Sequence, residues 1–142
     1  MCYELYLSTS SSEDLARYDS ELVHFERPER LDDKTAGTLQ NPVKWYIGSK
    51  SGCSCTFRHR AGGELGFDEP QDWIPEDEDN VKATAELYHV MASLVQGGDE
   101  VDCLDLWPGT ELDQITVISF RISVVSEKAF RLFENHHFVF GP

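Results

Sequence analysis

The segment from Pro75 to Gln96 most limits how this chain can fold, because it has the repeat of a long amphipathic helix. Four consecutive acids, Glu76 to Asp79, would lie at the positive end of that helix, and Gly97-Gly98 would end it. The apolar residues that share one face are Val81, Ala85, Tyr88, Ala92 and Val95, with Leu87, Met91 and Leu94 beside them. A stripe of this width has to be buried against another layer of structure, which the rest of the chain must supply.

Alternating apolar and polar residues predict strands on both sides of this helix. The predicted strands are residues 3–8, 21–26, 43–47, 53–60, 101–107, 115–125 and 137–140. Short helices are expected over residues 10–18 and 126–135, and residues 28–42 are expected to form a long connection. Together these elements predict an α+β fold, with a mixed or mainly antiparallel sheet of five to six strands covered by one long helix and one or two short helices.

Residues 1–142 are expected to form a single globular domain, since 40% of them are hydrophobic and 11% are aromatic. No apolar run approaches the ~18 residues of a membrane span, and the first residues lack the basic and apolar parts of a signal peptide. We therefore expect a cytoplasmic protein without membrane contact, whose four cysteines are reduced thiols. A net charge of −14 argues against nucleic acid as the partner and suits either solubility or a basic protein partner.

Residues 34–63 depart from this acidic composition, because they hold five cationic side chains and no carboxylate. The cationic residues are Lys34, Lys44, Lys50, Arg58 and Arg60. Backbone N–H groups freed by glycine, together with serine hydroxyls and cationic heads, can hold a phosphate or a carboxylate. The leading hypothesis is a binding module that uses the loop Gly48–Arg60 for a small anionic ligand or an acidic partner. Its ligand-binding residues would be Lys50, Ser51, Gly52, Ser54, Arg58 and Arg60.

The same cations have a structural alternative in the acidic segment, residues 64–79, which holds eight carboxylates and no cation. If the two segments lie together, the cations form internal ion pairs instead of binding a ligand. The Walker pattern Gly-x-x-x-x-Gly-Lys-Ser/Thr and the dinucleotide fingerprint are both absent, so neither nucleotide-binding loop is expected. A further hypothesis is an interaction protein without catalysis, whose acidic surface meets a basic partner.

Cysteine and histidine side chains in the same region predict a different, thiol-dependent kind of site. Cys53, Cys55 and His59 could hold a metal ion such as zinc, with Cys103 or Cys2 as a fourth ligand. Their Cys-x-Cys spacing differs from the paired Cys-x₂₋₄-Cys of structural zinc sites. A reactive or redox-active thiolate beside the neighbouring cations is a second possibility, and burial as a small apolar side chain is a third. Residues i and i+2 of an extended chain are ~6–7 Å apart, so Cys53 and Cys55 are badly placed for a mutual disulfide.

The remaining reactive groups predict no site of their own. Met1-Cys2 resembles the start of the class II glutamine amidotransferases, in which removal of the methionine exposes an N-terminal cysteine. That resemblance covers two residues, and an ordinary position in an edge strand is the other role open to Cys2. The carboxylates of Asp99, Glu100, Asp102 and Asp105 do not match the calcium-loop spacing and are expected to lie on solvated faces.

Overall fold

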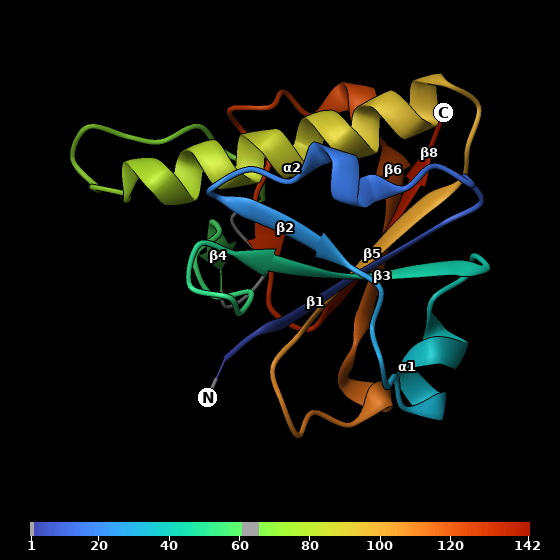
Figure 1. The fold of residues 1–142 in the computed structure, drawn as a ribbon. Helices are drawn as coiled ribbons and strands as arrows, with labels where there is room; N and C mark the ends of the chain where they lie inside the picture. The colour runs from blue at the N-terminus through green and yellow to red at the C-terminus, as the bar shows by residue number, and fades with distance from the viewer. Residues whose placement is uncertain (1, 61–65) are drawn as a thin grey trace.

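The computed structural model describes residues 2–60 and 66–142, and its main element is a six-stranded sheet in the order β2-β3-β1-β5-β8-β6 (Figure 1). The strands are β1 (Glu4–Thr9), β2 (Val23–Glu26), β3 (Val43–Ser49), β5 (Val101–Leu106), β6 (Thr116–Arg121) and β8 (His136–Gly141). Neighbouring strands are antiparallel except β6 and β8, which are parallel. The sheet is therefore mixed, and the predicted α+β fold class is confirmed.

The long helix α2 (Glu78–Gln96) covers one face of this sheet (Figure 1). It begins where the Asp77 carboxylate accepts N–H groups of the first turn, and Gly97 ends it. Leu87 and Met91 are fully buried on its inner side, where they join apolar side chains of β1 and β8 in the main core. The predicted helix is confirmed, although it starts a few residues after Pro75 because Asp77 acts as its cap.

The short helix α1 (Asp33–Thr38) lies on the opposite side of the sheet, beside a second, smaller core that includes Leu39 and Leu104 (Figure 1). The Asp32 carboxylate caps it by accepting the Thr35 N–H at 2.8 Å. The sequence predicted an irregular connection here, because a helix of six residues is too short to show a periodic pattern. Helices therefore contribute to the covering of both faces.

β5 lies in the middle of the sheet, and all six of its residues are buried. Val101 and Cys103 pack in the main core whereas Leu104 packs in the second core, so both faces of the strand are covered. The prediction that Asp102 and Asp105 lie on solvated faces is wrong, because both are fully buried in this strand. Each of the two acids is paired with a buried or half-buried histidine.

Residues 53–60 do not form the predicted return strand of a hairpin. They are turns and bends up to β4 (His59–Arg60), which pairs in parallel with β7 (Leu132–Phe133) instead of with β3. Serine side chains in and before this stretch bind the backbone groups that a strand ladder would use, which is a known route to turns. The predicted end of that strand, at residues 61–63, lies outside the described residues.

The predicted short helix over residues 126–135 is also wrong, because this stretch consists of turns and β7. The Arg58 guanidinium binds the carbonyl oxygens of Lys128 (2.7 Å) and Phe130 (3.1 Å), which a helix would pair with its own N–H groups. Short 3₁₀ turns are η1 (Leu15–Tyr18), η2 (Leu112–Gln114) and η3 (Ile122–Val124). Of the helices that the structure describes, none has the length and apolar character to cross a bilayer.

Candidate metal centre

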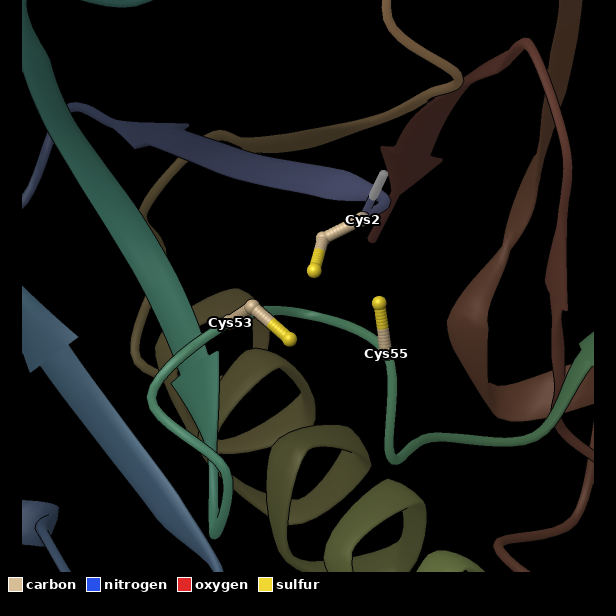
Figure 2. A group of neighbouring side chains, drawn as sticks. All are labelled: Cys2, Cys53 and Cys55. Atoms are coloured by element: carbon tan, nitrogen blue, oxygen red, sulfur yellow. The ribbon is translucent and has the colours of Figure 1, made fainter.

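The sulfur atoms of Cys2, Cys53 and Cys55 converge, and each Sγ lies within 4.8 Å of the other two (Figure 2). Cys2 comes from the segment just before β1, and the other two come from the loop after β3. Cys2 is exposed and the other two are half-buried, so this thiol site lies at the surface. Two thiolates that share one zinc ion at ~2.3 Å each are at most ~4.6 Å apart. The three cysteines can therefore hold a metal ion with little movement of their side chains.

The loop that carries two of the thiols, residues 49–56, is folded back on the end of β3 by Ser49. Both the hydroxyl (2.6 Å) and the N–H (2.8 Å) of Ser49 donate to the carbonyl oxygen of Cys53. Gly48 and Gly52 approach so closely that a Cβ on Gly48 would lie 3.1 Å from the Gly52 carbonyl oxygen. Gly52 also has φ of 86°, which favours glycine. The glycines and serines of this loop therefore form a tight turn, and this turn carries Cys53 and Cys55.

Ser54, between the two loop cysteines, fixes the loop to both neighbouring strands. Its fully buried hydroxyl donates to the Ile47 carbonyl on β3 (2.6 Å) and accepts the Leu5 N–H on β1 (3.0 Å). Two residues before Leu5, the backbone N–H of Tyr3 donates to the Sγ of Cys55 at 3.3 Å. The start of the chain is thus aligned along the loop, which explains why its cysteine joins the two loop cysteines.

A buried histidine–aspartate pair, His59 and Asp105, supports the loop from inside the protein. The Nε2 of His59 lies 2.6 Å from the carbonyl oxygen of Ser54, and its Nδ1 lies 2.9 Å from Asp105 Oδ2. A carbonyl oxygen only accepts, so Nε2 carries a hydrogen and donates it. The Tyr3 ring stacks on the imidazole with centroids 3.9 Å apart and planes at 7°. This pair therefore contacts residues adjacent to all three thiols.

Burial has the largest effect on the pKa of Asp105. It raises the pKa of the Asp105 carboxyl, and the hydrogen bond from His59 opposes that rise. The second oxygen of Asp105, Oδ1, has no hydrogen-bond partner among the described residues. Among the residues that the structure describes, His59 is thus the one side chain that hydrogen-bonds to Asp105.

The thiols themselves differ in acidity. The hydrogen bond between the Ser51 hydroxyl and Cys53 Sγ (3.3 Å) lowers the pKa of Cys53 to about 7, against a smaller effect of burial and with help from the other two thiols. Burial and the neighbouring thiols raise the pKa of Cys55 to about 11. Near neutral pH the cluster therefore carries part of one negative charge, chiefly on Cys53. A metal ion needs deprotonated cysteine ligands, and the first of these is available without a strong base.

Iodoacetamide should alkylate Cys53 at a rate that rises through a midpoint near pH 7, because only the thiolate reacts. Peptide mapping by mass spectrometry at a series of pH values measures this rate, with the fully buried Cys103 as the unreactive internal control. Ser51→Ala removes the hydrogen bond and should move the midpoint upward. A wild-type midpoint at ~8.5, the value of an ordinary free cysteine, would contradict the prediction.

The cations of the hypothetical anion site are paired with the acidic segment. The contacts join Lys50 to Asp79 (2.9 Å), Arg58 to Glu76 (2.8 Å) and Arg60 to Asp68 (3.0 Å). These are the internal ion pairs of the structural alternative, and each cation faces a different carboxylate. The other residues of that hypothesis serve the turn: Ser51 contacts a thiol, Gly52 has a positive φ and Ser54 is buried. In the described residues, the three cationic side chains thus face carboxylates of the protein, and the other three residues shape or fix the cysteine loop.

The thiol site differs from the set expected from sequence in one ligand. The sequence predicted His59 as a ligand and either Cys103 or Cys2 as a fourth, whereas in the structure Cys2 joins the cluster and both nitrogens of His59 are taken by other groups. Cys103 is fully buried in the main core. Sequence reasoning missed Asp105 as a support of the site, although a carboxylate within a run of apolar strand residues is a usable signal that it has a partner.

Comparison with protein-family models, with the curated proteins and with the solved structures finds no match to this chain. What the protein can do is therefore inferred from the thiol site and its surroundings.

Proposed function

We propose that this protein binds a thiophilic metal ion, zinc in the first instance, through the thiolates of Cys2, Cys53 and Cys55. The observation that carries the proposal is the convergence of three sulfur atoms from two segments that are distant in sequence. Thiolates prefer zinc and copper(I) to hard cations such as magnesium and calcium. Zinc also accepts three protein ligands with a fourth position filled by water or an added ligand.

The surroundings support the same function. The Tyr3 N–H donates to the Cys55 sulfur, and such a bond stabilises the thiolate form that a metal requires. Ser54 is fixed by three hydrogen bonds, so the two loop cysteines are held before any ion binds. A site whose ligands are already positioned loses less conformational entropy when the ion binds.

Zinc titration of the reduced protein, followed by native mass spectrometry and by competition with a chromophoric chelator, tests the proposal. We expect one zinc ion per chain in the wild-type protein. Loss of an outer-shell partner typically weakens metal binding ~10–100-fold, so Cys53→Ser, which removes a direct ligand, should weaken it by at least ~100-fold. Cys103→Ser is the matched control and should bind as the wild type does, since Cys103 is buried and is not one of the three clustered thiols.

Two results would overturn the assignment. Zinc uptake unchanged by Cys53→Ser would place the ion elsewhere, and no uptake by the wild type would reject zinc. Copper(I), which the same thiolates accept, is titrated in parallel under anaerobic conditions. Copper(I) binding without zinc binding would keep the thiolate site and change the identity of the ion.

A further inference from the structure

The three thiols of this site are not equally free to form a disulfide. Cys53 and Cys55 flank Ser54, whose hydroxyl and carbonyl are both fixed by hydrogen bonds. The turn brings the sulfurs of these two residues within 4.8 Å of each other, but a disulfide between residues i and i+2 closes a small ring through Ser54 and strains the hydrogen bonds that fix it. The loop would have to break those bonds to join its own two cysteines. Cys2, which comes from another segment, has its sulfur within 4.8 Å of both.

The thiols are also reachable by a small oxidant. Cys2 is exposed, Cys53 and Cys55 are half-buried, and the fourth cysteine of the chain, Cys103, is fully buried. In Figure 2 the Cys2 side chain extends from the start of the chain toward the two loop sulfurs. An oxidant that enters the site therefore meets three neighbouring thiols, of which Cys2 alone lies outside the fixed loop.

We propose that the thiol site is a target of hydroperoxides, hydrogen peroxide among them, and that its product is a disulfide between Cys2 and either Cys53 or Cys55. Cys2 is the obligate partner, and the two loop cysteines do not pair with each other. The disulfide removes two of the three sulfur donors and so releases the metal; this last part rests on the metal-binding function proposed above.

The chemistry balances with hydrogen peroxide as the only added reactant. A thiolate sulfur attacks one peroxide oxygen, the S–O bond forms, the O–O bond breaks, and hydroxide leaves and is protonated to water. A neighbouring thiolate then attacks the sulfenic sulfur, the S–S bond forms, and the S–O bond breaks to give a second water once protonated. Two thiols lose two electrons and one peroxide gains them. The third thiol stays reduced and can exchange with the disulfide, which moves the bond of Cys2 between its two partners.

Treatment of the metal-free, full-length protein with one equivalent of hydrogen peroxide tests the disulfide. Thiol counting and peptide mapping should show loss of two of the four thiols in the wild type, with Cys2 in every disulfide. Cys53→Ser and Cys55→Ser should each still form one intramolecular disulfide with Cys2, while Cys2→Ser should form none and accumulate a sulfenic acid that dimedone traps. Cys103→Ser should behave as the wild type. A disulfide between Cys53 and Cys55, or unchanged disulfide formation in Cys2→Ser, would overturn the proposal, as would a wild type that forms none.

A second arm separates this inference from the metal-binding function. Zinc-loaded protein is treated with peroxide in the presence of a chromophoric chelator, and we expect zinc release in step with disulfide formation. If the wild type takes up no zinc, the metal-binding function fails while the metal-free arm still decides the disulfide. If zinc stays bound after the disulfide has formed, the release step is overturned.

Discussion

Replacing Arg58 by leucine is expected to destabilise the fold by ~3–5 kcal/mol, because it removes one partner of a buried ion pair. The Arg58 side chain is 1% exposed, and each of its five N–H donors has an acceptor. Nε and one terminal nitrogen bind both oxygens of Glu76, at 2.9 and 2.8 Å. The remaining donors reach the carbonyl oxygens of Asp68, Lys128 and Phe130.

The leucine variant leaves the carbonyl oxygens of Lys128 and Phe130 without the donor that Arg58 supplies, and Glu76 keeps only its contact with Arg131, at 3.2 Å. Arg58→Lys should recover only part of the loss, since an ammonium offers three donors from a single point and cannot reproduce the planar fork. Urea denaturation followed by circular dichroism measures the change. Arg17→Leu is the matched control, because Arg17 has an exposed ion pair with Glu13 and its loss should change stability far less than the loss of Arg58 does. Equal stability of the Arg58 and Arg17 variants would show that the buried network contributes nothing specific.

The elements that sequence predicts well here are those whose signal is local. β1, β3 and α2 each follow from the period of their own apolar residues, and the acids before α2 and the glycines after it bound the helix. The return strand after β3 was mispredicted because Cys53 to Arg60 alternates like a strand while serine hydroxyls satisfy the backbone instead. A one-dimensional pattern does not record that competition.

The thiol site was half predictable for a related reason. Cys53 and Cys55 stand out in the sequence, but Cys2 reaches them only because β1 pairs with β3 and because Ser54 bonds to β1. Strand order is a non-local property that periodicity leaves undetermined. The pairing of the cations with the acidic segment, in contrast, was visible as an alternative because the two segments follow each other in the chain.

Replacing His59 by alanine is expected to affect stability and metal binding together, because this imidazole joins a buried carboxylate to the cysteine loop. The Asp105 carboxyl would lose its only side-chain partner in the described protein, which we expect to cost ~3–5 kcal/mol at neutral pH. The carbonyl of Ser54 would lose its donor, and the loop would be less well fixed. Loss of such an outer-shell partner should weaken zinc binding by ~10–100-fold.

The stability loss should depend on pH in a defined direction. Burial already raises the pKa of Asp105, and removal of His59 takes away the hydrogen bond that opposes the rise. The folded variant then binds a proton more strongly than the unfolded chain does, so its stability falls as pH rises from the unfolded pKa of about 4 through the folded pKa. Urea denaturation of wild type and variant should therefore show a difference that is large at pH 7 and becomes smaller toward pH 4.

Two variants separate the local role of this imidazole from a general loss of packing. His59→Gln keeps an N–H donor on a side chain of similar reach, so it should recover part of the zinc affinity that alanine loses. His89→Ala is the control, since the His89 side chain is 65% exposed and its partner is a surface glutamate. If His59→Ala lowers stability while zinc affinity, measured under conditions where the variant is folded, stays at the wild-type value, His59 supports the fold alone. If glutamine restores affinity without restoring stability, the bond to the Ser54 carbonyl is what positions the thiolates, and the aspartate beneath it serves to hold the ring.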